Sequence, residues 1–226
     1  MKGATMSDDP RATRPASSLQ PGDAAPDFTR PAVAREGMVS LADYRGRTRL
    51  LLGLFRGIYC PFCRRAIVRM GDAAERLGAE GVSALAVVAT TAENARLYFR
   101  YRPPRLPVAA DPDFATHRAY GVPAPRRADI EQIFRVTRVN PTGELPGPLP
   151  IREASAALSR LEGFQPTPTD AENAAWPHLQ FLGQFLVDRG GIIRRTNIEG
   201  AREGLAGLGK FPSDAELVAA VRGLPA

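Results

Sequence analysis

The feature that most constrains this chain is a pair of cysteines separated by two residues, between a strand-like run and a helix-like run. Cys60 and Cys63 are the only cysteines among 226 residues. Residues 48–55 (TRLLLGLF) form a short apolar block of the kind shown by a strand buried on both faces. Two cysteines at this spacing and at such a junction indicate thiol redox chemistry.

Residues 61–79 are predicted to form an amphipathic helix, because apolar residues recur at three- and four-residue steps. Pro61 suits the first helical position, so Cys60 is expected at the N-cap and Cys63 about one turn into the helix. Unpaired backbone N–H groups and the helix dipole should then favour the thiolate of Cys60. We therefore expect Cys60 to be an exposed attacking thiolate and Cys63 to resolve the product as a disulfide.

Two other interpretations of the pair are open. Free cysteines are often small apolar core residues, although the spacing and position of Cys60 and Cys63 count against this. A zinc site would need His117 and His178, which lie far apart in the sequence, and neither falls in a short His-x-His pattern. We expect no metal and no other cofactor.

Length and composition point to one well-filled core. The chain is 44% hydrophobic, which suits a single domain with an insertion. Its net charge of +6 comes almost entirely from scattered arginines, so nucleic acid is not an expected partner. The first thirty residues lack the apolar run of a signal peptide, and no stretch approaches a membrane span. We expect a cytoplasmic protein without a membrane partner, in which the cysteine pair is kept reduced.

The first half of the chain predicts alternating strands and helices. Residues 1–20 are polar and contain several prolines, which predicts a disordered arm. A second buried strand is predicted at 82–89, and Thr90 with Glu93 forms a capping-box signal for a helix through about residue 101. Counted from the strand at 48–55, the order is therefore β-α-β-α.

A short strand is expected near 106–109. Asp111 and Pro112 then read as the N-cap and first residue of a short helix that ends at Tyr120. This adds a third strand and a third helix to the alternating series.

The last part of the chain predicts a hairpin and a helix. Residues 184–198 carry two apolar runs around a turn at 188–191. Ser213 and Glu216 form another capping-box signal, for a helix that runs to about Arg222. Together these patterns predict an α/β thioredoxin-like fold at 21–226, with a central mixed β-sheet flanked by helices.

A segment at about 122–177 is not needed by a minimal fold of this kind, and we predict that it is an insertion before the C-terminal hairpin. It is rich in proline and contains two helix-like pieces, at 129–138 and 151–163. Segments of this length in compact domains are usually functional or mobile. It could be a lid over the cysteines, a dimer contact or inert decoration.

Three stretches resemble the alkyl hydroperoxide reductase/thiol-specific antioxidant family, and more closely its peroxiredoxin-like branch with an RGxxCPxC motif. They are residues 22–29 (GDAAPDFT), 55–63 (FRGIYCPFC) and 185–188 (FLVD). The resemblance covers about 20–120 and 178–222. It implies a thioredoxin fold, thiol-based antioxidant or oxidoreductase activity, no metal, and frequent homodimers.

The chain departs from the family pattern at two places. The hydroxyl that peroxiredoxins place three residues before the attacking cysteine is missing, since Gly57 precedes Cys60 at that distance. Leu182 stands where peroxiredoxins have an arginine and thioredoxin-like reductases a cis-proline. Both departures count against fast peroxide reduction, which needs donors on the leaving oxygen and a cation beside the thiolate.

A nearby arginine could replace the missing cation. Arg56 is the best candidate because it precedes the cysteines on the same loop, and Arg64 and Arg65 are the others. The alternative for Arg56 is a solvated surface charge. Tyr59 is expected to be a packing residue, because a phenol with an ordinary pKa near 10 is a poor acid at neutral pH.

The sequence therefore predicts an antioxidant oxidoreductase that reduces peroxides or disulfides by cycling Cys60 and Cys63 between dithiol and disulfide. A cellular thiol or a thioredoxin-like protein would be its reductant. The alternative is a non-enzymatic redox sensor, in which the disulfide alters the segment at 122–177 and thereby the binding of a partner.

Overall fold

A five-stranded mixed sheet forms the centre of the molecule in the computed structural model, which describes residues 18–175 and 178–223. The strand order is β5-β4-β3-β8-β9. β3, β4 and β5 are parallel to one another, whereas β8 pairs antiparallel with β3, and β9 antiparallel with β8. Their bounds are Arg49–Phe55 for β3, Val82–Val88 for β4, Val108–Ala110 for β5, Gly183–Val187 for β8 and Ile193–Ile198 for β9.

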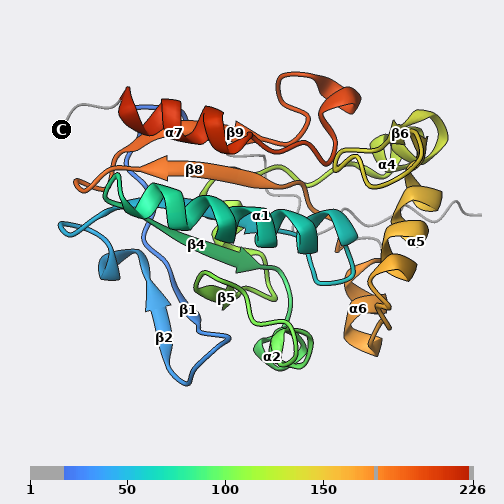
Figure 1. Ribbon diagram of the computed structural model, residues 1–226, viewed down its shortest axis with the longest axis horizontal. Helices are drawn as coiled ribbons and strands as arrows, with labels where there is room; N and C mark the ends of the chain where they lie inside the picture. The colour runs from blue at the N-terminus through green and yellow to red at the C-terminus, as the bar shows by residue number, and fades with distance from the viewer. Residues whose placement is uncertain (1–17, 176–177, 224–226) are drawn as a thin grey trace, which may run out of the picture.

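Helices cover the sheet as the alternating sequence pattern requires. α1 (Pro61–Gly78) links β3 to β4, and α2 (Ala92–Phe99) links β4 to β5. α1 and α7 (Asp214–Arg222) lie side by side on one face (Figure 1). Two buried apolar clusters result, one on each face, because β3 and β4 are apolar on both sides. The predicted α/β thioredoxin-like fold is confirmed in this architecture.

Most predicted elements are confirmed within one or two residues, but the predicted N-cap of α2 and the predicted start of α3 are wrong. α2 is capped by Thr91, whose hydroxyl accepts the N–H of Asn94, and not by Thr90. Thr90 is instead fully buried and accepts a hydrogen bond from the Asn94 amide group. α3 (Ala115–Ala119) begins after Phe114, later than predicted.

The prediction for α3 was wrong because Asp111 caps the chain in another way. Its carboxylate accepts the N–H of Thr116, inside α3, at 2.9 Å. Phe114 occupies the intervening N-cap position with a φ of 55°, a left-handed conformation that no sequence signal at this position predicts. The short strand β5 likewise begins two residues later than the predicted strand at 106–109.

The predicted C-terminal hairpin and last helix are confirmed. β8 and β9 enclose the turn at 188–191, and Ser213 caps α7 through the capping box with Glu216. A small hairpin of β1 (Thr29–Pro31) and β2 (Met38–Ser40), which the sequence analysis did not predict, precedes the main sheet. The predicted disordered arm at 1–20 lies almost wholly outside the described residues.

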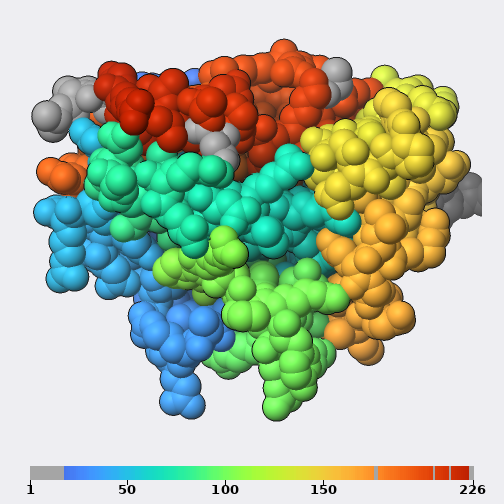
Figure 2. Space-filling view, in the orientation of Figure 1, coloured from blue at the N-terminus to red at the C-terminus, as the bar shows by residue number. Residues whose placement is uncertain are grey.

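The segment predicted as an insertion folds into short elements beside the N-terminal end of α1 (Figure 1). These elements are α4 (Arg127–Val136), β6 (Arg138–Val139), β7 (Leu149–Pro150), α5 (Ile151–Leu161) and α6 (Pro168–Asn173). In the space-filling view this segment packs directly against the surface of α1 (Figure 2). No helix in the described part of the chain is long and apolar enough to cross a membrane.

Candidate active site

The two cysteines lie at the N-terminus of α1, as predicted. Cys60 is the N-cap residue, and Pro61 occupies the first helical position. The backbone N–H of Cys63 donates to the Cys60 sulfur at 3.4 Å. A helix start therefore directs one of its unpaired N–H groups at Cys60, which stabilises negative charge on that sulfur. Both cysteines are free thiols.

The two sulfurs have opposite acid strengths. Burial alone would raise the pKa of Cys60, but the hydrogen bond from the Cys63 thiol, the charge of Arg56 and the Cys63 N–H together lower it to about 7. Burial, together with the hydrogen bond and charge of Cys60, raises the pKa of Cys63 well above its ordinary value. At neutral pH, Cys60 is thus the thiol that ionises more readily, and Cys63 remains a protonated thiol.

Cys60 is not exposed, which corrects the expectation of an exposed thiolate. It is 4% exposed and Cys63 is 1% exposed. The reason is that the segment at 122–177 extends the buried cluster over the start of α1. Val139, Leu145 and Leu158 of that segment belong to the same buried cluster as the two cysteines. Little of the Cys60 side chain is therefore open to solvent in this conformation.

Arg56 is the cation beside the cysteines. Its side chain is 16% exposed, so the surface-charge alternative is wrong. Its guanidinium forms an ion pair with Glu199, which is itself buried. Burial would lower the pKa of Arg56, but the charge of Glu199 raises it above its ordinary value, so this arginine stays charged. Its charge lowers the pKa of both cysteines.

Glu199 is a site residue that the sequence analysis missed. It follows β9 directly and has no motif around it, so only the pairing of β9 with β8 brings it to Arg56. Its carboxylate also accepts the N–H of Gly209 at 2.7 Å and the N–H of Leu182 at 3.3 Å. Glu199 thus fixes Arg56 to the two backbone segments that enclose the site. Leu182 contributes this backbone N–H, whereas its side chain is apolar.

Arg64 and Arg65 do not supply the cation for Cys60. Both pair with Glu162 at the C-cap of α5, and Arg65 also pairs with Glu144. The guanidinium of Arg64 lies 3.9 Å from the ring centroid of Phe164. These two arginines therefore attach the segment at 122–177 to the first turns of α1. Whether the segment acts as a lid, a dimer contact or inert decoration stays a prediction.

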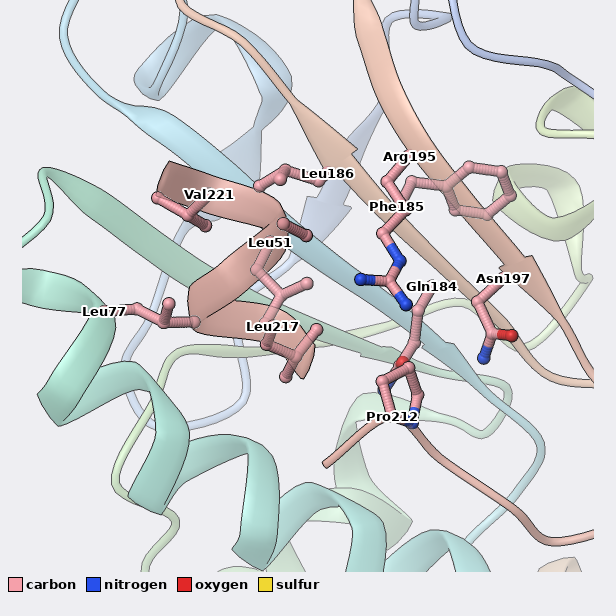
Figure 3. A pocket seen from close by; sticks show the side chains of 11 residues that line it. Leu51, Leu77, Gln184, Phe185, Leu186, Arg195, Asn197, Pro212, Leu217 and Val221 are labelled. Atoms are coloured by element: carbon pink, nitrogen blue, oxygen red, sulfur yellow. The ribbon is translucent and has the colours of Figure 1, made fainter. Parts of the chain in front are cut away.

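Two cavities lie apart from the cysteines, and neither is lined by Cys60 or Cys63. The first has about 10 Å³ of space, enough for one water molecule, between α7 and the sheet beside Gln184 and Pro212 (Figure 3). The second, of about 330 Å³, lies between α1 and the start of α7. Among the described residues, no group of three or more His, Cys, Asp or Glu side chains could hold a metal ion.

Several solved structures share this fold. A candidate thiol:disulfide interchange protein DsbE from Chlorobium tepidum aligns with a TM-score of 0.50 and 20% identity, over 90% of this chain and 99% of that one. The reduced 2-Cys peroxiredoxin of Plasmodium vivax aligns with a TM-score of 0.57 and 14% identity, over 89% and 79%. Peroxidoxin BcpB from Mycobacterium tuberculosis aligns with a TM-score of 0.56 and 12% identity, over 92% and 99%.

These identities are low, so the structural likeness shows a shared fold only. A search of curated proteins finds no match to this chain. A sequence model of the AhpC/TSA family, however, matches residues 21–144, which are more than half of the chain and include both cysteines and Arg56. The chain therefore belongs to the AhpC/TSA family, and its function is thiol-dependent redox chemistry.

Proposed function

We propose that this protein is a thiol peroxidase that reduces small hydroperoxides, with Cys60 as the attacking thiolate and Cys63 as the resolving thiol. The observation that carries the proposal is the difference in pKa between Cys60 and Cys63. Cys60 caps α1 with a pKa lowered to about 7, and Cys63 one turn later keeps its proton because its pKa is raised. A peroxidase of this type needs one sulfur that attacks and a second that closes the disulfide.

The substrate is proposed from the burial of Cys60. A protein disulfide must present its sulfur to an accessible thiolate, whereas Cys60 is only 4% exposed. A hydroperoxide with a small substituent needs far less room.

The proposed reaction has three steps. The Cys60 thiolate attacks the terminal peroxide oxygen, the O–O bond breaks, and the departing oxygen takes up a proton from solvent, which leaves a sulfenic acid on Cys60. The Cys63 sulfur then attacks the Cys60 sulfur, and the hydroxyl group leaves as water with the Cys63 proton. Two electrons from a cellular thiol or a thioredoxin-like protein finally reduce the Cys60–Cys63 disulfide.

The direct test compares oxidants with the purified protein. Reduced protein is mixed with hydrogen peroxide, a small organic hydroperoxide or insulin, and Cys60–Cys63 disulfide formation is followed by mass spectrometry. We expect one disulfide per equivalent of hydroperoxide and turnover when dithiothreitol is present. Turnover of insulin with no consumption of hydroperoxide would overturn the proposed substrate, and retention of both free thiols with every oxidant would overturn the activity itself.

Location, reductant and oligomeric state belong to the same proposal. A cytoplasmic location suits a cysteine pair that is kept reduced between turnovers. The reductant and a homodimer are proposed from the family resemblance, and size measurement in solution tests the dimer. We propose no role for nucleic acid or membranes.

A second candidate function, a redox sensor, is favoured by the attachment of the segment at 122–177 to α1. Arg64 and Arg65 directly follow Cys63 and both pair with Glu162. Closing a disulfide at Cys63 would pull on the first turn that carries these arginines. The sensor alternative predicts that oxidation changes the proteolytic cleavage of this segment without catalytic turnover. Cleavage that is identical in both redox states would contradict it.

A further inference from the structure

We propose that the Tyr59 hydroxyl and the Arg56 Nε–H together bind the departing oxygen of the substrate, in place of the hydroxyl that this chain lacks before Cys60. The inference rests on the proposed peroxidase function and adds a catalytic role for Tyr59. It reverses the sequence-based expectation that Tyr59 only packs.

Tyr59 has an unusual orientation for a tyrosine. Such side chains usually bury the ring and keep the hydroxyl in water or on a hydrogen-bond partner. Here the residue is only partly buried, and it packs against the cluster that contains the cysteines. Its hydroxyl oxygen is nevertheless buried and has no hydrogen-bond partner among the described residues. A phenol that turns its polar end inward without a partner carries a desolvation cost, which a bound substrate oxygen would offset.

Gly57 allows this orientation. A Cβ atom at Gly57 would lie 2.8 Å and 2.9 Å from two ring carbons of Tyr59, so the ring lies directly over this glycine. The same Cβ would lie 3.2 Å from the carbonyl oxygen of Ala89, which limits how far the backbone can yield. The glycine that replaces the expected hydroxyl residue therefore makes room for the phenol of Tyr59. One change thus removes the usual donor and admits another.

Arg56 supplies the second donor. Its terminal nitrogen pairs with Glu199, but its Nε is buried and has no partner among the described residues. Arg56 and Tyr59 both lie in the short loop between β3 and Cys60, and Tyr59 packs against the buried cluster that contains Cys60 and Cys63. The phenol also interacts electrostatically with Arg56 and with both cysteines. Two unpartnered donors beside a nucleophile match the arrangement that stabilises a developing oxyanion.

The chemistry assigns a hydrogen-bonding role to Tyr59. Burial raises its pKa, so it keeps its proton throughout the pH range in which Cys60 ionises. As Cys60 attacks the terminal oxygen, negative charge grows on the other oxygen, and the O–H and Nε–H donate to it. The proton that completes the departing group comes from solvent, so Tyr59 ends each turnover unchanged. A disulfide substrate offers only sulfur, a weak acceptor, and gains little from these donors.

The test is to compare two reactions of Cys60 in the Tyr59→Phe variant. Oxidation by hydrogen peroxide develops charge on oxygen, whereas alkylation by iodoacetamide depends on the thiolate alone. We expect the second-order rate of peroxide reduction to fall about a hundredfold, at the lower end of the range known for loss of one oxyanion donor. The alkylation rate and its dependence on pH should stay within about twofold of the wild type.

Tyr101→Phe is the matched control, because Tyr101 is 80% exposed and far more accessible than Tyr59. It should change neither reaction.

Gly57→Ala is a second test that keeps the hydroxyl but displaces the ring, and it should also slow oxidation more than alkylation. Equal slowing of both reactions in Tyr59→Phe, or no slowing, would overturn the role of Tyr59 while the peroxidase function stands. A wild-type protein that does not reduce peroxide would overturn the proposed function and this inference with it.

Discussion

Two arginines beside the cysteine pair are used in different ways, and the difference separates architecture from chemistry. Arg64 is 1% exposed, and each of its three nitrogens is occupied: Nε by Glu162 at 2.5 Å, one terminal nitrogen by the Ile58 carbonyl at 2.7 Å and the other by the Ser159 hydroxyl at 3.1 Å. Arg56 pairs with Glu199 but leaves Nε without a partner in the described part of the chain.

Because each nitrogen of Arg64 already has a partner in the loop before Cys60 or in the segment at 122–177, we infer that Arg64 serves to hold structure. It joins the loop before Cys60 to the segment at 122–177. Arg56 has its buried Nε–H without a partner in the described part of the chain, and its charge lowers the pKa of both cysteines. We infer that the loop residue at 56 contributes to the reaction and the helix residue at 64 to the enclosure of the site. Each prediction below tests this division.

The largest expected effect comes from Cys60→Ser. Because the hydroxyl of serine stays protonated at neutral pH, hydroperoxide reduction should fall by about a thousandfold or more. Peroxide consumption under excess dithiothreitol measures it. Cys63→Ser should still react once with hydroperoxide and then accumulate an oxidised Cys60, visible by dimedone labelling and mass spectrometry.

The reverse pattern would break the assignment of the sulfurs. If Cys60→Ser still forms an oxidised product at Cys63 at the wild-type rate, Cys63 is the nucleophile. Both variants should retain the wild-type circular dichroism spectrum, which serves as the control for folding.

The next effect separates the two arginines. Arg56→Gln removes a positive charge that lowers the pKa of Cys60, so that pKa should rise and the alkylation rate at about pH 7 should fall about tenfold. Glu199→Gln should act in the opposite direction, because the charge of Glu199 raises the pKa of Cys60. The alkylation rate measured against pH gives the pKa of Cys60 in the wild type, in Arg56→Gln and in Glu199→Gln.

Arg64→Gln is the matched control, since it makes the same substitution at an even more buried arginine. It should leave the pKa of Cys60 unchanged. If the pKa of Cys60 rises as much in Arg64→Gln as in Arg56→Gln, Arg56 and Arg64 do not differ in their effect on Cys60.

Much of the fold could be predicted from the sequence, since local signals determine it. The apolar run of β3, the proline after Cys60 and the capping box at Ser213 each act within a few residues, and each was confirmed. The start of α3 was wrong because the conformation of Phe114 follows from packing and from the reach of the Asp111 carboxylate. Neither has a sequence pattern.

The site could be predicted only in part, for a related reason. The placement of Cys60 at a helix start follows from its neighbours, but its burial follows from residues about eighty to one hundred positions later in the chain. Glu199 and Glu162 are ordinary acidic residues in sequence, and only the sheet pairing and the packing of α5 bring them to arginines. Contacts between residues so far apart in the chain produce no local sequence motif from which they could be predicted.

A smaller effect tests the architectural role of Arg64. Glu162→Gln removes the charge that Arg64 and Arg65 share, so the free energy of unfolding should fall by about 1 to 3 kcal/mol, since the carboxylate is only partly buried. Urea unfolding measures it. Glu153→Gln, at an exposed position on the same helix, should cost less than about 0.5 kcal/mol.

The pKa of Cys60 should be unaffected in Glu162→Gln. If that pKa rises while the free energy of unfolding is unchanged, the segment at 122–177 affects the acidity of Cys60 and does more than cover it.

The smallest effect is the dependence of stability on pH. The pKa of Cys60 is lowered from an ordinary value of 9.0 to about 7 by folding, so the unfolded chain binds more protons than the folded one between these values. Stability from this group is therefore fully present above about pH 9 and is lost as the pH falls through about 7. The raised pKa of Cys63 opposes the gain only as the pH nears its ordinary range.

The free energy of unfolding of the wild type, relative to Cys60→Ser, should thus increase by about 1 to 2 kcal/mol from about pH 6 to about pH 8. Urea titrations of both proteins across this range measure the difference, and groups that do not interact with Cys60 cancel in it. In Arg56→Gln the increase should shrink, whereas in Arg64→Gln it should persist. If the free energy of unfolding of the wild type relative to Cys60→Ser does not change with pH, the helix start and Arg56 do not favour the thiolate of Cys60. Arg56 and Arg64 would then not differ in their effect on the reactive sulfur.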